Sequence, residues 1–362
     1  MIQAQDGGIG RWLFTKEALE HAQEAAHERA AQVLRERRML VPKPLSLSQG
    51  SQLVIFYAQK LLELCKLCSA PSEVNWTSLV FFKRFYAVSS PMEFDPLTMM
   101  HTCVHVACKI EELREITLDK VLEVSGFAED AAMKTKVTDL ELQLLENLGF
   151  KLLVEPKPSG ALRFLAEELR ASTTSTVKGF PGSSENLQEL LSKAETMVYD
   201  LCISSNAVLL YPASIIFAAA WGTALDEGLG HNNKGAVPSS SVITILLQTL
   251  KEADKDSVSK MWKEVLHAMK HIHCKADLDK VAMQELAKTA TKCQRAFGII
   301  HEERKERHEA HRKERKRRRQ DMKVPLSGSI EELKRKAQAL QAHDEDVEDF
   351  VIHGPRDDME ED

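Results

Sequence analysis

The sequence predicts an all-α protein made of two groups of five helices, with one further helix at each end. Leu, Ala, Glu and Lys dominate the 362 residues, whereas Gly (16) and Pro (12) are sparse, and this balance favours helix over strand. Apolar residues recur at helical spacing over most of the chain. With 43% hydrophobic residues, the chain has enough material for two compact domains with tails.

The N-terminal segment, residues 1–45, is expected to hold one isolated helix and a linker. The stretch 12–39 is charged and rich in alanine, and both properties favour helix. Pro42 and Pro44 then interrupt it, because proline lacks the backbone N–H donor and clashes with the preceding helical turn.

The first group of five helices is expected within residues 46–155. Apolar periodicity predicts helices at 47–68, 71–88, 96–113, 117–125 and 130–148. Gly126 and Gly149 follow the last two and are typical stop signals, since glycine readily adopts the left-handed conformation at a helix C-terminus.

The predicted helix at 96–113 is apolar almost all round, which is typical of a helix in the middle of a bundle. Asp95 is a good N-cap, and Pro96 suits the first helical position. Only a narrow strip is expected to escape burial, and it consists of Thr98, Thr102, His105 and Lys109. A lysine in such a helix must reach either water or an acidic partner.

The second group is expected within residues 156–275, with helices at 158–170, 185–208, 212–225, 238–250 and 254–272. The stretch from Leu201 to Leu225 contains no Lys, Arg, Asp or Glu, and it is long enough to be weighed as a membrane span. Ser204-Ser205-Asn206 and Pro212 interrupt this stretch, so we expect two buried bundle helices and no membrane partner.

A C-terminal helix is expected at 276–300, with an apolar face that should pack on the core. This face consists of Leu278, Val281, Leu286, Cys293 and Phe297. Residues 301–341 form a charged extension, and residues 342–362 form an acidic tail that is expected to be disordered.

The charged extension contains five consecutive basic residues, Arg315, Lys316, Arg317, Arg318 and Arg319. Such a cluster is typical of a nuclear localisation signal, and the alternative is a solvated helix extension. Direct nucleic-acid binding is not expected, because the first 300 residues are slightly acidic and the acidic tail can compete for the same basic residues.

Signals for metal binding or catalysis are weak. Seven cysteines, an odd number, and the lack of a secretory signal indicate a reducing compartment. Cys65-x-x-Cys68 and His271-x-His273-Cys274 have the residue types of a zinc site, but the first pair ends an apolar helix instead of lying on a knuckle. We therefore expect no metal and no cofactor. The sequence has no phosphate-binding glycine loop, nucleophile elbow or kinase motif, so we expect no enzymatic activity.

Several short motifs occur in a specific order and spacing. In the first group they are Lys83-Arg84-Phe85-Tyr86, Met92-Glu93-Phe94-Asp95-Pro96 and Ala107-Cys108-Lys109-Ile110-Glu111-Glu112. Elsewhere they are Arg11-Trp12-Leu13-Phe14-Thr15 and Leu209-Leu210-Tyr211-Pro212-Ala213-Ser214. Together they resemble the cyclin family, and within it the cyclins of the H type. This resemblance implies a cyclin fold, with two five-helix cyclin-box repeats and extra N- and C-terminal helices.

The resemblance also implies that Lys109, on the third helix of the first repeat, and Glu141, on the fifth, hold a kinase. Glu141 lies nine residues before Phe150, as in the family's fifth-helix pattern. Adjacent Lys and Glu side chains on an apolar surface can bond the backbone ends of a docked helix. The alternative is a salt bridge that acts only within the chain. Trp12 and Phe14 are expected to add kinase contacts particular to the H type.

The apolar residues near this pair leave two interpretations open. They either line a groove for the kinase's regulatory helix or belong to the core, and core packing is favoured because aromatic residues at helical spacing usually face inward. These residues are Phe82, Phe85, Tyr86, Leu144 and Leu148.

By the same resemblance, the expected partners are a cyclin-dependent kinase of the CDK-activating type, a ring-finger assembly factor and transcription factor IIH. The chain would act in the nucleus as a non-catalytic activator, in cell-cycle control and RNA polymerase II transcription. Two alternatives stay open. One is a transcription cyclin of type C, K, L or T. The other is a double-repeat nucleic-acid-binding adaptor similar to general transcription factor IIB, whose zinc ribbon and basic core are not found in this sequence.

Overall fold

A computed structural model describes residues 12–35, 43–173, 184–228, 242–244, 252–271, 280–321 and 335. Every regular element in these ranges is a helix, which confirms the all-α class. The chain divides into two compact units, Met1–Ile299 and Ile300–Asp362, which are considered separately.

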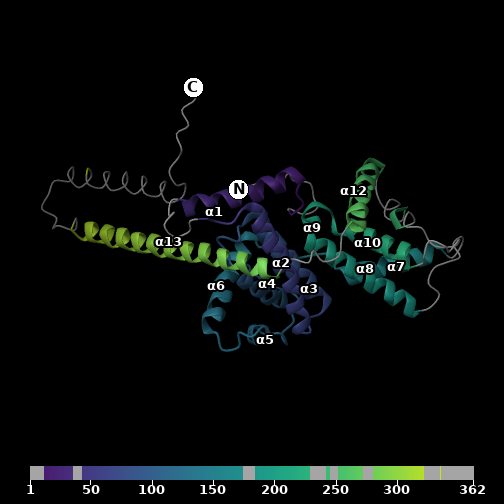
Figure 1. Cartoon of the computed structure of the whole chain (residues 1–362), viewed down its shortest axis with the longest axis horizontal. Helices are drawn as coiled ribbons and strands as arrows, with labels where there is room; N and C mark the ends of the chain where they lie inside the picture. Colours follow the sequence, from purple (N-terminus) through teal and green to yellow (C-terminus); the bar gives the residue numbers. More distant parts are fainter. Residues whose placement is uncertain are drawn as a thin grey trace, which may run out of the picture. The chain divides into compact units, whose positions relative to one another are not determined.

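The first five-helix group contains the predicted elements, drawn in blue tones in Figure 1. They are α2 (Leu47–Leu67), α3 (Ser72–Val88), α4 (Pro96–Ile110), α5 (Leu118–Val124) and α6 (Ala131–Asn147). Gly126 and Gly149 follow α5 and α6 with φ angles of 84° and 59°. Both glycines therefore end their helices in the left-handed conformation that was predicted for them.

Helix α4 forms the centre of this group, with α2, α3, α5 and α6 in contact with it. Asp95 caps its N-terminus by accepting hydrogen bonds from the backbone N–H groups of Leu97 (3.3 Å) and Thr98 (3.1 Å). The predicted exposed strip is wrong at two of its positions, because Thr98 and Thr102 are buried. Their hydroxyls find local acceptors, the Asp95 carboxylate for Thr98 (2.7 Å) and the Thr98 carbonyl oxygen for Thr102 (3.0 Å). A satisfied hydroxyl can be buried at little cost.

The second group repeats this arrangement around α10 (Ala213–Gly228). Helix α10 contacts α7 (Pro158–Thr173), α8 (Ser184–Ser204), α9 (Ala207–Leu210) and α12 (Glu252–Lys270). These helices are drawn in teal and green in Figure 1. A central apolar helix surrounded by its neighbours is therefore the common design of both groups.

Two predictions for the second group need correction or lie partly outside the described residues. The helix expected at 185–208 is divided into α8 and α9, because the Ser205 hydroxyl donates to the Leu201 carbonyl oxygen (2.6 Å) and accepts from the Ala207 N–H (3.2 Å). Such side-chain bonds compete with the helical ladder. Of the helix expected at 238–250, only residues 242–244 are described, and they are helical. Within the part of the chain that the structure describes, no helix is long and apolar enough to cross a membrane.

One hydrophobic core runs through both groups. At the junction, the Trp76 ring of α3 lies 5.3 Å from the Phe217 ring of α10, centroid to centroid. Helix α3 also contacts α7 and α9. Because they share a core, the two repeats form one cooperative body.

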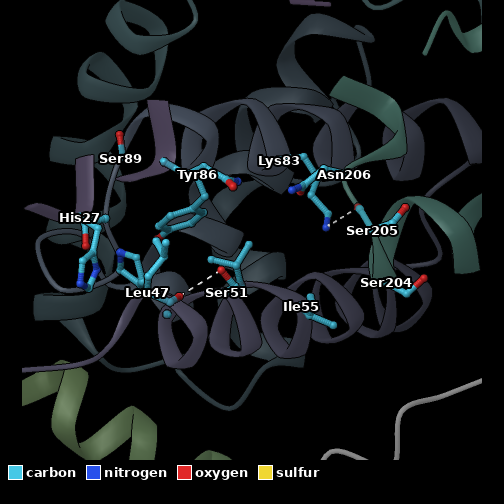
Figure 2. A pocket seen from close by; sticks show the side chains of 15 residues that line it. His27, Leu47, Ser51, Ile55, Lys83, Tyr86, Ser89, Ser204, Ser205 and Asn206 are labelled. Carbon is cyan, nitrogen blue, oxygen red and sulfur yellow. Dashed lines mark hydrogen bonds between the residues drawn. The ribbon is translucent and has the colours of Figure 1, made fainter. Parts of the chain in front are cut away.

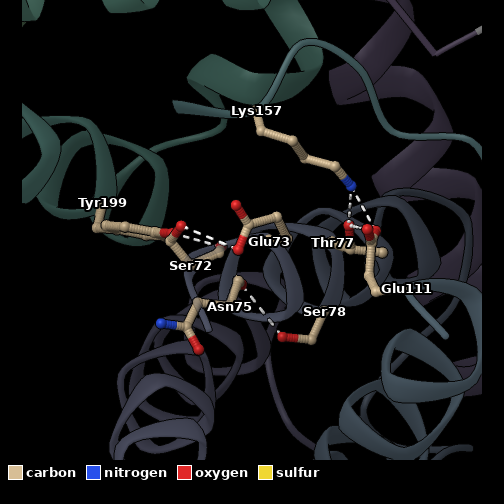
Figure 3. A network of polar contacts seen from close by, with 8 residues as sticks. All are labelled: Ser72, Glu73, Asn75, Thr77, Ser78, Glu111, Lys157 and Tyr199. Atoms are coloured by element: carbon tan, nitrogen blue, oxygen red, sulfur yellow. Dashed lines mark hydrogen bonds and ion pairs between the residues drawn. The ribbon is translucent and has the colours of Figure 1, made fainter. Parts of the chain in front are cut away.

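Polar contacts reinforce the junction, as Figure 3 shows. Lys157, just before α7, pairs with Glu111 at the end of α4 and donates to the Thr77 hydroxyl of α3 (2.7 Å). Thr77 in turn donates to Glu111 (2.6 Å). Tyr199 of α8 donates to the Ser72 carbonyl oxygen of α3 (3.2 Å). Each bond joins a residue of one repeat to a residue of the other, except the bond from Thr77 to Glu111.

Lys83 of α3 is a buried charge that the sequence patterns did not indicate. Its ammonium, 3% exposed, donates to the carbonyl oxygens of Ile203 (2.8 Å) and Ser205 (3.0 Å) at the C-terminal end of α8. These carbonyls lack helical donors, so the lysine satisfies them. Burial lowers the pKa of Lys83 to about 8.

The terminal helices of the first unit are α1 (Lys16–Arg35) and the beginning of α13 (Lys280–Asp321). They share a small apolar cluster in which Ala30 and Leu34 of α1 lie with Ala290 and Cys293 of α13. The N- and C-terminal helices therefore meet on one apolar cluster.

The bounds of both terminal helices differ from the prediction. The described part of the N-terminal helix is shorter than 12–39, and residues 36–42 lie outside the described ranges. Helix α13 continues to Asp321 instead of ending near residue 300, since no proline interrupts it. Val281 is 67% exposed, so its predicted packing is wrong, whereas Cys293 is buried and Phe297 is packed against the cluster. Leu278 lies outside the described residues.

Candidate functional site

The structure brings Lys109 and Glu141 together. The Lys109 ammonium, in the last turn of α4, lies 2.6 Å and 2.8 Å from the two carboxylate oxygens of Glu141 on α6. The two side chains are 49% and 24% exposed. The pair therefore forms within the free chain while staying accessible to a partner, and both charges can be shared with a docked group.

Large apolar side chains are exposed on α6 and just after it, close in sequence to Glu141. Leu142 is 58% exposed, Phe150 64% and Leu153 78%. Phe150 follows the Gly149 stop in a left-handed conformation (φ 56°), and its N–H donates to the Leu145 carbonyl oxygen (2.9 Å). A tight C-terminal turn thus holds an aromatic ring in solvent.

In the sequence analysis, Phe150 served only to define the spacing from Glu141, and no pattern indicated that Leu142 or Leu153 would be exposed. A usable signal existed, because Leu142 falls off the buried face of α6 that carries Val137 and Leu144.

His105 lies one turn before Lys109 on α4. It is half-buried, and its Nδ1 atom is buried without a hydrogen-bond partner. Burial lowers its pKa, the Lys109 charge lowers it further, and the Glu141 charge opposes both effects. A neutral imidazole therefore lies beside the ion pair near neutral pH.

The aromatic and leucine side chains whose role was left open belong to the core, as the favoured interpretation predicted. All of them are between 0% and 5% exposed, and they are Phe82, Phe85, Tyr86, Leu144 and Leu148. They support the surface that carries the ion pair, but they do not line it.

Trp12 and Phe14, just before α1, contact α3 and α9, whereas the ion pair lies on α4 and α6. The Arg84 guanidinium lies 5.5 Å from the Trp12 ring, and the Phe14 N–H donates to the Leu209 carbonyl oxygen (2.8 Å). Burial lowers the pKa of Arg84 to about 10. Both aromatic residues are half-buried, so they anchor the N-terminal segment to the junction of the two repeats.

A small polar cavity of about 100 Å³ lies between α1, α2, α3 and the turn after α8 (Figure 2). The hydroxyls of Ser51, Ser204 and Ser205 line it, and each donates to a carbonyl oxygen of its own helix. The space corresponds to about three water molecules. The Lys83 ammonium and the Tyr86 hydroxyl, which also line the cavity, donate to carbonyl oxygens as well.

The cysteines do not form a metal centre in the described part of the chain, where no cluster of three His, Cys, Asp or Glu side chains is found. Cys65 and Cys68 are buried thiols, and burial raises the pKa of Cys65 to about 12. Such thiols are inert packing residues.

The basic run belongs to the second unit, where it continues α13. Lys316 is exposed and Arg315 is partly exposed. Arg317, Arg318 and Arg319 lie in the helix, and their side chains lie outside the described residues.

Comparison with known proteins matches part of the chain to a family. The cyclin N-terminal domain family matches residues 26–153, which contain α2 to α6 and the Lys109–Glu141 pair. The putative cyclin-H of Dictyostelium discoideum is 28% identical over 155 residues, which cover 42% of this chain and 52% of that protein. Cyclin-H1-1 of Arabidopsis thaliana is 22% identical over 299 residues, which cover 74% and 82%. The chain thus spans about half the length of the first relative.

Solved structures with the same fold include a chain of the CAK complex from Chaetomium thermophilum bound to ATP-γ-S. The TM-score is 0.65 at 22% identity, with 82% of this chain and 91% of that chain covered. A chain of the yeast TFIIK (Kin28/Ccl1/Tfb3) complex matches with a TM-score of 0.53 at 19% identity, covering 72% and 96%. At these identities the likeness concerns the fold.

A double helical repeat with a central apolar helix in each half, and a Lys–Glu pair on the third and fifth helices of the first half, defines a cyclin fold. The chain has this fold, and its residues 26–153 match the cyclin N-terminal domain family. Within that family it is similar to proteins named cyclin-H.

Proposed function

We propose that this chain is the regulatory subunit that binds and activates a cyclin-dependent kinase of the CDK-activating type. The observation that carries the proposal is the partly exposed Lys109–Glu141 pair at the edge of a cyclin box, next in sequence to exposed Leu142 and Phe150. Similarity to H-type cyclins supports the choice among cyclin types.

The proposed mechanism is conformational. A helix of the kinase docks on the surface of α4 and α6, where its polar backbone ends meet Lys109 and Glu141 and its apolar side chains cover Leu142 and Phe150. Docking holds the kinase's regulatory helix inward, so that the kinase's own lysine and glutamate pair and position ATP. The cyclin supplies no catalytic group.

Trp12 and Phe14 are proposed to contribute to kinase binding mainly by anchoring α1. Their contacts with Arg84 and Leu209 fix the N-terminal segment on α3 and α9. A kinase surface that reaches α1 would then meet a rigid element, and rigid elements bind with a smaller loss of conformational entropy.

The wider assignment follows from similarity alone. We place the chain in the nucleus, with a ring-finger assembly factor and transcription factor IIH as partners, acting in cell-cycle control and RNA polymerase II transcription. The basic run Arg315 to Arg319 is the proposed nuclear localisation signal.

A charge exchange tests the docking surface. The double variant Lys109→Glu with Glu141→Lys keeps an internal ion pair, so the chain should fold, but it presents each charge to the partner in the wrong place. We expect affinity for a CDK-activating kinase subunit to fall at least about 100-fold, or about 3 kcal/mol, with a parallel loss of polymerase-tail phosphorylation. Titration calorimetry and a kinase assay measure the two effects.

A matched control is the exchange Lys134→Glu with Asp119→Lys, because this exposed pair also joins α6 to another helix of the first repeat. The control should bind and activate normally. If the natural chain does not bind such a kinase, the function belongs to another transcription cyclin type or to a nucleic-acid adaptor. Equal binding by the two exchange variants would disprove the role of Lys109 and Glu141.

A further inference from the structure

The basic end of α13 has a charge density that the cyclin function does not use. Seven of the eight residues from 312 to 319 are Arg or Lys, and Glu314 is the one acidic residue. All eight lie in one continuous helix that ends at Asp321. Arg312, Lys313 and Lys316 are exposed.

Helical geometry sets the spacing of these charges. Eight residues at about 1.5 Å rise span about 12 Å, so a net charge of about six corresponds to one positive charge per about 2 Å of helix axis. Double-stranded DNA carries one negative charge per about 1.7 Å of its axis. The two linear charge densities therefore match closely.

The helical form also fits a duplex. The major groove of B-DNA, about 12 Å wide, admits an α-helix, and phosphates then line both sides of it. Successive positions of a helix lie about 100° apart, so the basic positions of the run are distributed around the helix axis and can face both phosphate rows. Every residue from 312 to 319 except Glu314 is Arg or Lys, the side chains that neutralise phosphates, so the run is suited to contacts that do not depend on base sequence.

We infer that residues 312–319 of α13 form a sequence-independent binding surface for double-stranded DNA. The expectation against nucleic acid was based on the slightly acidic charge of the first 300 residues and on the acidic tail. Exposed charges interact only over a Debye length of about 8 Å at physiological salt, so the local charge of the helix governs the contact. The acidic tail lowers the affinity but does not remove the surface.

Fluorescence anisotropy of the full chain with a labelled 20-base-pair duplex, in 50 to 300 mM KCl, tests this inference. Five or six phosphate contacts give a slope of log affinity against log salt of about −4 to −6. Unrelated duplex sequences should bind with affinities equal within about threefold. The variant with Arg312, Lys313, Arg315 and Lys316 all changed to Gln should lose at least about tenfold in affinity at 100 mM KCl. Its slope should be shallower by about 2 to 4.

The first part of the same helix offers a matched control. Lys280, Lys288, Lys292 and Arg295 are exposed, and changing all four to Gln removes the same charge from α13. This control should retain DNA affinity and slope within about twofold. Both variants should bind the kinase as the natural chain does.

Three outcomes would overturn the inference. They are no binding by the natural chain at 50 mM KCl, a slope near zero, or equal losses in both quadruple variants. If changing 312–316 leaves DNA binding intact and abolishes only nuclear accumulation, the run is a transport signal and not a DNA surface.

Discussion

His101 is a buried, neutral histidine that makes stability depend on acid. Its ring is 0% exposed, and its nitrogens lie 2.8 Å from the Leu97 carbonyl oxygen and 2.9 Å from the Ser125 hydroxyl. Burial lowers the pKa of His101, while the bond to Leu97 and the charge of Asp95 oppose the shift more weakly. The charged imidazolium is therefore disfavoured in the folded state.

We predict that the free energy of unfolding falls as pH drops below about 6.5. Below this pH, His101 binds a proton in the unfolded state but not in the folded state, so acid stabilises the unfolded state. The free energy of unfolding should therefore fall by at most about 1.4 kcal/mol per pH unit. The neutral variant His101→Gln should show a smaller loss between pH 6.5 and 5. Urea unfolding monitored by circular dichroism at each pH measures this difference.

The exposed histidine His21 of α1 provides the control for that measurement. His21→Gln should follow the natural chain at every pH. If His101→Gln loses stability with acid as steeply as the natural chain, another buried group carries the effect, and His105 is the next to test.

At the residue scale, the sequence predicted more reliably which charged side chains pair than which side chains are buried. The family resemblance brought Lys109 and Glu141 to one site, and the two side chains do form an ion pair there. Lys83 stands in a comparable apolar run, yet its partners are backbone carbonyls of the other repeat. Backbone acceptors leave no trace in side-chain patterns, so the buried lysine could not be predicted.

At the element scale, helix ends with local causes were predictable. Asp95, Gly126 and Gly149 act through their own side chain or backbone conformation, and each ends or starts a helix as expected. The break at Ser205 was visible as Ser-Ser-Asn, but its strength comes from two hydrogen bonds that only the folded chain reveals. The length of α13 was missed because the apolar pattern ends before the helix does.

Helix α1 is the element whose removal should separate folding from activation. Its buried face consists largely of alanines with Leu19 and Leu34, so it removes less apolar surface from water than α4 or α10. Deleting residues 1–40 should leave the ten-helix body folded, with a lower melting temperature. It should also weaken kinase activation severalfold. Calorimetry and a kinase assay compare the two effects.

The variant Trp12→Ala with Phe14→Ala tests the same idea within the full chain. It removes the contact of the Trp12 ring with Arg84 and the packing of the Phe14 ring on the cluster of Leu19 and Leu209, while the backbone bond to Leu209 stays possible. It should therefore reduce activation in the same direction with a smaller loss of stability. Full activation by both the shortened chain and this variant would show that α1 has no part in kinase binding.

At the scale of the whole molecule, the two repeats share a design that sequence comparison between them does not reveal. Each surrounds one apolar helix, α4 or α10, with its neighbours, and a single core continues from one to the other. The patterns predicted the helices of each repeat because amphipathicity is local. The junction depends on contacts between residues distant in the sequence, such as Lys83 with Ile203, and local patterns contain no information about them.

Lys83 should couple the two repeats thermodynamically. The variant Lys83→Met leaves the carbonyls of Ile203 and Ser205 without their donor, so we expect a loss of about 1 to 3 kcal/mol in a single unfolding transition of the body. The folded-state pKa of about 8 lies below the ordinary lysine value of 10.5, so the unfolded state binds more protons between these values. The stability of the natural chain relative to the variant should therefore rise with pH from about 8 to 10.

Urea unfolding at pH 7, 8, 9 and 10 measures this difference, with Lys66→Met on the exposed side of α2 as the control. The control should unfold like the natural chain at each pH, because Lys66 is in solvent in both states. Two separate transitions in Lys83→Met would mean that the lysine alone holds the repeats together, against the shared core. An unchanged single transition would mean that water replaces the ammonium at no cost, and the junction would then rest on its apolar contacts and on the Lys157–Glu111 pair.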